Sequence, residues 1–170
     1  MEHPPRVRRG VFVDVQNLFY CVRSVFARSR LNYEALKEFF ATPEATTFFV
    51  AFSYYDPEAE RQRNFLSALA LMGYRVIAKP IRRLADGTIK ANMDIEMTLE
   101  ILTTATYLDE VVLITGDGDF APLASYLARQ GKRVIVVGPD QLTATELIYA
   151  CHEFHNLSHI PNVIELEEAF

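Results

Sequence analysis

Short apolar runs rich in β-branched residues recur along the chain and alternate with longer segments whose apolar residues repeat at helical spacing. Each run predicts a strand, and each longer segment has room for the helical crossover that joins parallel strands. The alternation therefore predicts an α/β fold with a mostly parallel sheet of five or six strands. The predicted strands are residues 11–13, 46–55, 74–79, 111–115, 134–137 and, as a sixth, 157–160.

Capping signals place helices between these strands. Asn32 is a good N-cap, Asp56 precedes a proline and a glutamate that favour a helix start, and Gly131 is a favourable helix stop. The predicted helices are residues 16–28, a stretch from Asn32 onward, 56–73, 94–108, 119–129 and 145–154.

Two further segments have a recognisable pattern. In the helix over residues 94–108, the spacing of Ile95, Leu99 and Leu102 predicts one buried face. The segment 80–89 contains an Asp-Gly turn signal with basic residues around it, which predicts an exposed basic hairpin or loop.

The length of 170 residues fits one domain, so we expect a single domain over residues 1–170, with 1–6 and 165–170 as loosely ordered ends. Half of the residues are apolar, which excludes a disordered chain, and two cysteines are too few for a disulfide scaffold. No apolar run approaches the ~20 residues that cross a bilayer, and the first residues lack the apolar core of a signal peptide. We therefore expect a cytoplasmic protein without membrane contact.

The net charge of −5 is unevenly distributed along the chain. Residues 1–90 contain 14 Lys and Arg against 9 Asp and Glu, whereas residues 91–170 contain 3 against 13. Because a local basic patch is sufficient to bind nucleic acid, the acidic total does not exclude such a partner.

Conspicuous acidic residues fall where predicted strands end. Asp14 closes the first strand, Asp117 and Asp119 directly follow the strand at 111–115, and Asp94 begins a helix. Ligands of open α/β sheets bind outside the carboxyl ends of the strands, where the strand order reverses. If the two strands concerned are neighbours, all four carboxylates converge on one crevice.

Convergent carboxylates repel one another unless a cation neutralises them, and their hard oxygen atoms suit Mg²⁺ or Mn²⁺. Gly116 and Gly118 allow the loop to bend tightly and to aim both of its aspartates inward. One ion could polarise a phosphodiester and activate a water molecule, and two ions about 3.5–4 Å apart could clamp both reacting oxygens. The pattern favours a metal-binding cluster.

Structural roles compete with this interpretation. Asp119 and Asp94 could be helix caps, whereas Asp117 has no obvious capping role. Asn17 could cap the first helix, or its amide could hold a phosphate or a metal-bound water. Thr115 could form a hydrogen bond beside the metal, although a β-branched strand residue needs no such role.

Three stretches carry a resemblance to a known family. They are Asp14-Val-Gln-Asn17, Lys90 followed by Asp94, and Thr115-Gly116-Asp117-Gly118-Asp119-Phe120 with Pro122. Together they resemble the NYN domain of the PIN-like nuclease superfamily, in particular its LabA-like branch, over about residues 7–157.

The resemblance implies a doubly wound fold with helices on both faces of the sheet, a metal site lined by carboxylates, and ribonuclease activity. Carried over by position, it makes Asp14, Asp94, Asp117 and Asp119 the metal-binding catalytic acids, with Asn17 beside them. Two stretches depart from the family pattern. The spacing between Lys90 and Asp94 is one residue longer than usual, and Cys151-His152 stands where an Ala-Asp pair is common.

The first hypothesis is a ribonuclease dependent on Mg²⁺ or Mn²⁺ that hydrolyses RNA phosphodiesters with a metal-activated water. Asp14, Asp94 and Asp117 would be ligands, and Asp119 a ligand or the base for the water. Single-stranded RNA is the expected partner, because exposed aromatic residues can stack on its bases. The residues expected to contact the RNA backbone are Arg82, Arg83, Lys90 and Lys79.

Other functions compete with the nuclease. A non-catalytic RNA-binding or regulatory module could retain the fold, although phosphate binding does not require four carboxylates. A phosphotransferase with an aspartate nucleophile is disfavoured because Gln16 stands where such enzymes have a second aspartate. The histidines near the C-terminus lack a zinc motif, and the apolar, aromatic-rich early helices allow a homodimer.

Overall fold

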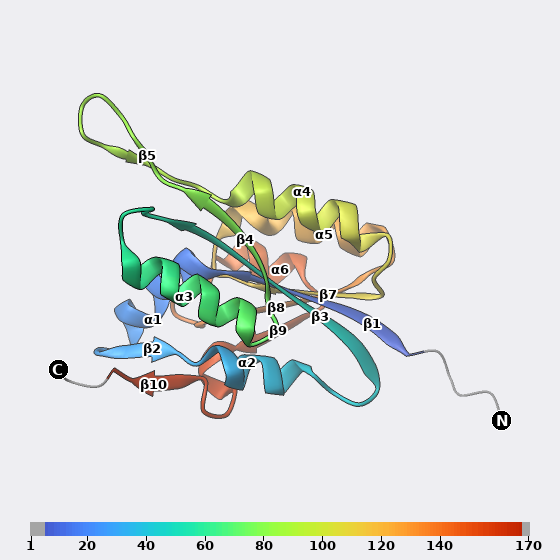
Figure 1. The fold of residues 1–170 in the computed structure, drawn as a ribbon. Coiled ribbons are helices and arrows are strands. Elements are labelled where there is room, and N and C mark those ends of the chain that lie inside the picture. The colour runs from blue at the N-terminus through green and yellow to red at the C-terminus, as the bar shows by residue number, and fades with distance from the viewer. Residues whose placement is uncertain (1–5, 168–170) are drawn as a thin grey trace.

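The computed structural model describes residues 6–167 and contains a six-stranded sheet in which all neighbouring strands are parallel (Figure 1). The order across the sheet is β4-β3-β1-β7-β8-β9. The central strands are apolar on both faces because helices cover both, as is typical of parallel sheets. The strands are β1 (Val7–Asp14), β3 (Ala45–Tyr55), β4 (Arg75–Pro80), β7 (Glu110–Ile114), β8 (Arg133–Gly138) and β9 (Glu153–Asn156).

Helices pack on both faces of this sheet, which confirms the doubly wound α/β fold (Figure 1). Val11 and Val13 of β1 belong to one buried cluster and Phe12 to the other, as the alternation of side chains along a strand requires. On one face lie α1 (Val15–Val25), α2 (Tyr33–Phe40) and α3 (Glu60–Leu71), and on the other α4 (Asp94–Ala105), α5 (Ala121–Arg129) and α6 (Thr145–Ala150).

The strand order reverses between β1 and β7. From β1 the chain moves outward through β3 and β4, and it then returns to the other side of β1 to form β7. The carboxyl ends of β1 and β7 therefore lie side by side, as the convergence of the acidic residues requires.

Short pairs and turns complete the fold. Two 3₁₀ turns cover Gly118–Phe120 and Leu157–His159. The strands β5 (Arg82–Arg83) and β6 (Ile89–Lys90) form an antiparallel hairpin that projects beyond the sheet (Figure 1), which confirms the predicted basic hairpin. A second antiparallel pair joins β2 (Ser29–Leu31) to β10 (Ile164–Leu166).

Several predicted boundaries were wrong. The helix expected from residue 56 begins at Glu60, because Asp56 accepts a hydrogen bond from the backbone of Glu58 and holds a turn. The first helix ends at Val25, and Arg28, with a φ of 55°, turns the chain into β2. The sixth strand lies at residues 153–156, whereas residues 157–159 form a 3₁₀ turn.

The buried face predicted for α4 was also wrong. Ile95 and Leu99 are 72% and 59% exposed, and Leu102 is exposed as well, whereas Met97 and Ile101 are buried. Apolar residues occupy two faces of this helix, so spacing alone could not choose between them. The face with Met97 and Ile101 packs into the core on the sheet. Ion pairs from β4, Lys79 to Glu96 at 2.7 Å and Arg75 to Glu100, support the helix in this orientation.

The predicted loose end at residues 165–170 needs a correction. Glu165 and Leu166 are part of β10, and the Glu165 carboxylate accepts a hydrogen bond from Arg30 at 2.8 Å. Residues 168–170 lie outside the described residues, as do 1–5 of the predicted loose N-terminal segment.

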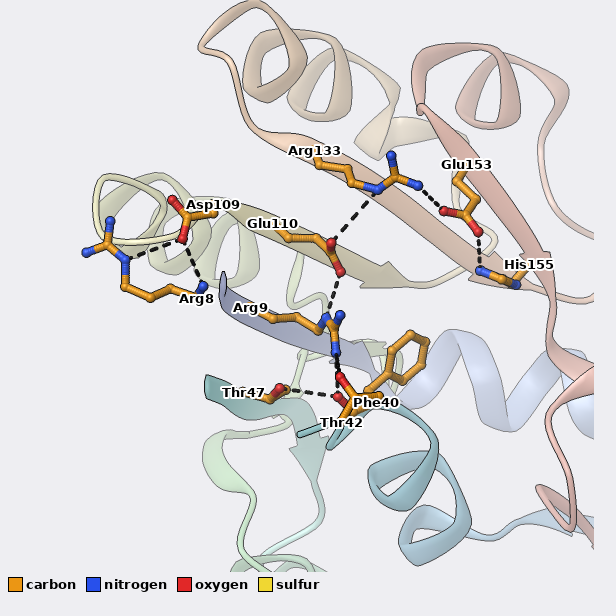
Figure 2. A network of polar contacts seen from close by, with 10 residues as sticks. All are labelled: Arg8, Arg9, Phe40, Thr42, Thr47, Asp109, Glu110, Arg133, Glu153 and His155. Carbon is orange, nitrogen blue, oxygen red and sulfur yellow. Dashed lines mark hydrogen bonds and ion pairs between the residues drawn. The ribbon is translucent and has the colours of Figure 1, made fainter. Parts of the chain in front are cut away.

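Ion pairs tie the amino ends of the central strands together (Figure 2). Arg9 of β1 donates from Nε to Oε1 of Glu110 on β7 at 2.6 Å. Its Nη1 donates to the Phe40 carbonyl and the Thr42 hydroxyl at the end of α2. The Arg9 and Glu110 side chains are only 12% and 10% exposed. The network continues through Arg133, Glu153 and His155 on one side and through Thr47, which donates to the Phe40 carbonyl, on the other. Arg8 and Asp109 form a separate pair beside it.

No helix within residues 6–167 combines the length and the apolar character needed to cross a membrane.

Candidate metal centre

Three carboxylates from separate elements converge at the carboxyl edge of the sheet. Asp14 is the last residue of β1, Asp94 the first residue of α4, and Asp117 lies in the loop after β7. One carboxylate oxygen of each lies within 4.8 Å of one oxygen of each of the others. Within residues 6–167 this is the only such group of three acidic, histidine or cysteine side chains. Oxygen atoms at this spacing suit one hard divalent cation such as Mg²⁺ or Mn²⁺.

Asp14 is held in place from both sides. Its Oδ2 accepts a hydrogen bond from the Thr115 hydroxyl at 2.9 Å, and its Oδ1 accepts a long one from the backbone of Asn17 at 3.4 Å. Asp14 is therefore the N-cap of α1, a role that was considered above for Asn17.

The Asn17 side chain fastens the acidic loop. Its Oδ1 accepts a hydrogen bond from the backbone N–H of Gly116 at 2.7 Å and a weaker one from the Cys21 thiol. Thr115 acts similarly, because its Oγ1 accepts a hydrogen bond from the Asp117 backbone at 3.1 Å. Asn17 therefore positions Gly116, and Thr115 positions both Asp14 and Asp117.

Asp117 has a capping role in addition to its place in the trio, and Asp119 lacks the capping role that was considered for it. Asp117 caps the 3₁₀ turn by accepting a hydrogen bond from the Asp119 backbone at 2.9 Å. Asp119 caps nothing, since α5 follows from Phe120 without a side-chain cap. Asp119 lies outside the close trio but near enough for its charge to raise the pKa of Asp94.

The extra residue between Lys90 and Asp94 does not remove Asp94 from the site. Asn92 accepts a hydrogen bond from the Asp94 backbone at 2.6 Å, and the Met93 side chain is buried in the core. At the other departure from the family pattern, His152 accepts the backbone N–H of Val134 on its Nδ1 at 2.9 Å. This imidazole therefore has a structural bond in the sheet.

Burial and mutual repulsion make the trio hard to ionise completely. The pKa of Asp14 is raised to about 6, first by desolvation and to a smaller extent by the charges of Asp94 and Asp117, whereas the hydrogen bonds from Thr115 and from the Asn17 backbone lower it. Desolvation and then the charge of Asp117 raise the pKa of Asp94. A bound cation would relieve both the desolvation and the repulsion of these carboxylates, so the trio suits a divalent ion.

Asp14→Asn is expected to stabilise the metal-free protein at neutral pH. The pKa of Asp14 in the folded protein exceeds its unfolded value, so its favourable contribution is present below about pH 4 and is lost as the pH rises through 6. The difference between the two pKa values lowers the free energy of unfolding by about 3 kcal/mol at neutral pH, and asparagine, which does not ionise, avoids this loss. Urea unfolding in EDTA at pH 4.5 and pH 7.5 measures it, and a difference between variant and wild type that is independent of pH would contradict the prediction.

Close packing around the acidic loop explains its glycines. A Cβ at Gly116 would lie 3.1 Å from the Leu142 carbonyl oxygen. A Cβ at Gly118 would meet the Glu146 carboxylate and lie 2.9 Å from Ala144 Cβ. Glu146 is thus a further acidic residue beside the loop, and the sequence pattern did not single it out because it follows no strand.

Gly118→Ala is expected to destabilise the protein by about 1–3 kcal/mol, because the added methyl overpacks the contact with Ala144. Thermal unfolding measures the loss. The double variant with Ala144→Gly removes the opposing methyl and should recover part of it. An unchanged melting temperature for Gly118→Ala would contradict the packing argument.

Of the four basic residues proposed for RNA contact, two form ion pairs with carboxylates and two are exposed on the hairpin. Lys79 is paired with Glu96 and Arg83 with Asp56, at 3.2 Å. Arg82 and Lys90 are exposed and face each other across the hairpin.

Comparison with known proteins agrees with this geometry. The NYN domain family model matches residues 8–158. The Low amplitude and bright protein LabA of Synechococcus elongatus is 30% identical over 172 residues, which span 95% of this chain and 89% of that protein. The crystal structure of a protein of unknown function from Vibrio parahaemolyticus has a TM-score of 0.80 and 31% identity, covering 92% of this chain and 96% of that one. The chain therefore belongs to the NYN domain family and is a homologue of LabA.

Proposed function

We propose that the protein is a ribonuclease that depends on Mg²⁺ or Mn²⁺. The observation that carries the proposal is the trio of Asp14, Asp94 and Asp117 at the carboxyl edge of a sheet with the NYN fold. Capping explains Asp14 and Asp117 one at a time, but it does not explain why three mutually repelling carboxylates meet at one point, where their burial and repulsion oppose folding of the metal-free chain.

Asp14, Asp94 and Asp117 would hold the cation. When bound, a divalent ion there would polarise a phosphodiester and lower the pKa of an attacking water. Asp119, at the rim of the trio, is the residue proposed to accept the proton of that water. Thr115, Asn17, Gly116 and Gly118 support the site by fixing the positions of Asp14 and of the acidic loop.

RNA is the proposed substrate, and the hairpin is a proposed contact with its backbone. Arg82 and Lys90 are exposed on it and available to phosphates. Lys79 and Arg83 must exchange their present partners, Glu96 and Asp56, for phosphates if they take part. Such contacts carry no base specificity and weaken as the salt concentration rises.

The test is cleavage of a fluorescent single-stranded RNA by purified protein with Mn²⁺, with Mg²⁺ and with EDTA. We expect cleavage with either metal and none with EDTA, together with a rise in melting temperature on adding Mn²⁺. If the protein neither cleaves the RNA nor shows a rise in melting temperature with Mn²⁺, the proposal is overturned. Binding of intact RNA without cleavage would favour a non-catalytic RNA-binding module.

A further inference from the structure

A groove of about 760 Å³ lies on the side of the sheet that carries α1 and α3, and its lining begins at the residues that follow Asp14. Val15 and Gln16, which directly follow Asp14, line its inner end. The Gln16 carboxamide donates to the Ser53 hydroxyl and to the Tyr54 carbonyl, both at the end of β3 and both in the groove lining. Since Asp14 pairs in register with residue 52 of β3, the groove starts within two residues of Asp14 on both strands, although no carboxylate of the trio lines it.

Two solvent-exposed phenylalanines lie on opposite walls of the groove. Phe19 belongs to α1 and is 59% exposed, and Phe65 belongs to α3 and is 37% exposed. Phe65 rests edge-on against Tyr33, with 5.5 Å between the ring centroids, so its ring is supported from behind. Leu31 and Leu66 supply further apolar lining. Exposed aromatic rings of this kind are surfaces on which bases can stack.

Arginines dominate the charge of the groove. Its lining contains Arg23, Arg30 and Arg61 and the carboxylate of Glu167. The Arg23 guanidinium lies 5.1 Å from the centroid of the Phe19 ring and 3.5 Å from Glu167, and Arg30 is paired with Glu165 at 2.8 Å. Arg61 is exposed and forms no ion pair within residues 6–167. Arg61 can therefore contact a phosphate without losing an ion pair.

We propose that this groove binds the unpaired nucleotides of single-stranded RNA that lie next to the scissile phosphate. Bases stack on Phe19 and Phe65, and phosphates contact Arg61 and Arg23. The inference rests on the proposed ribonuclease function and adds to it the location of the substrate strand. Aromatic rings combined with arginines are the lining of grooves that hold single strands, and the surplus of arginines favours a polyanion over an apolar peptide.

The aromatic contribution is tested by Phe19→Ala and Phe65→Ala. Binding of a fluorescent twelve-nucleotide oligouridine is measured by anisotropy in EDTA, so that the RNA stays intact. Each substitution is expected to weaken binding about tenfold or more, through the loss of one stacked base. Phe48→Ala is the matched control, because Phe48 is 54% exposed but lies outside the groove. Thermal unfolding shows whether the variants are folded.

The cationic contribution is tested by Arg61→Ala. Loss of one phosphate contact is expected to reduce the slope of log Kd against log salt concentration by about 0.7. Arg129→Ala, on the exposed side of α5, should leave the slope unchanged. A change in the salt slope separates a phosphate contact from a merely structural effect.

The outcomes separate this inference from the nuclease proposal. Equal RNA affinity for wild type, Phe19→Ala and Phe65→Ala would overturn the groove assignment, and so would a failure of the wild type to bind RNA; an apolar peptide would then be the better occupant. If Mn²⁺ supports no cleavage but the groove variants lose RNA binding, the groove stands and the nuclease proposal fails. If cleavage occurs and the groove variants keep the wild-type affinity for RNA, the nuclease proposal stands and the groove assignment fails.

Discussion

Asparagine in place of Asp117 is expected to lower the rate of RNA cleavage by at least about 10³-fold, roughly 4 kcal/mol of transition-state stabilisation. The substitution removes one of three converging negative charges but keeps an Oδ1 that can accept the backbone N–H of Asp119. The acidic loop should therefore stay in place while the affinity for the cation falls. Initial rates of cleavage of a fluorescent RNA in Mn²⁺ measure the effect.

Asp140→Asn is the matched control, because Asp140 is exposed and lies outside the trio. It should cleave at the wild-type rate and should keep the thermal stabilisation by Mn²⁺ that Asp117→Asn loses. Asp119→Asn should have a smaller effect, about 10- to 100-fold, because Asp119 acts from the rim of the trio. Equal cleavage by wild type and Asp117→Asn would indicate a contaminating nuclease.

Glu110→Ala is expected to destabilise the protein by about 3–5 kcal/mol, the largest loss of stability predicted for a polar residue of this fold. Glu110 is the carboxylate partner of Arg9, whose side chain is only 12% exposed at the amino end of the sheet. Its removal leaves the guanidinium with neutral partners alone, the Phe40 carbonyl and the Thr42 hydroxyl. Urea unfolding at pH 7 measures the change.

Two further variants test the cause. Arg8→Ala breaks the neighbouring pair with Asp109, whose side chains are about half exposed, and should cost at most about 1 kcal/mol. The double variant Arg9→Met with Glu110→Leu removes both buried charges and should be more stable than Glu110→Ala alone. If Arg8→Ala and Glu110→Ala were equally destabilising, burial of the charge would not be the cause.

The sequence pattern was sufficient for the features that depend on local composition. Buried strands such as β7, predicted at residues 111–115 and observed at Glu110–Ile114, are mostly apolar and β-branched, and their alternation with helical segments leaves few topologies for a parallel sheet. The acidic trio could also be anticipated, because Asp14 and Asp117 follow strands that the reversal of strand order makes neighbours. What had to be assumed was the strand order, and the structure confirms it.

Features decided by tertiary contacts could not be anticipated. Ile95 and Leu99 are exposed because the other apolar face of α4, with Met97 and Ile101, packs into the core, a choice that no local pattern reveals. The groove could not be predicted for the same reason, because α1, β2, α3 and Glu167 are brought together only by the fold. Glu146 approaches Gly118 from a helix far along the chain.

The central position of β1 has a consequence for biosynthesis. Its two neighbours emerge very unequally: β3 begins about 40 residues after β1, but β7 begins about 100 residues after it. Until β7 has left the ribosome, one edge of β1, with its buried residues Val11, Phe12 and Val13, has no partner, and long-range pairing of this kind is slow and exposes nascent chains to aggregation. The sheet around β1 is thus completed only after β7 has been synthesised, and Asp14 and Asp117 meet only then.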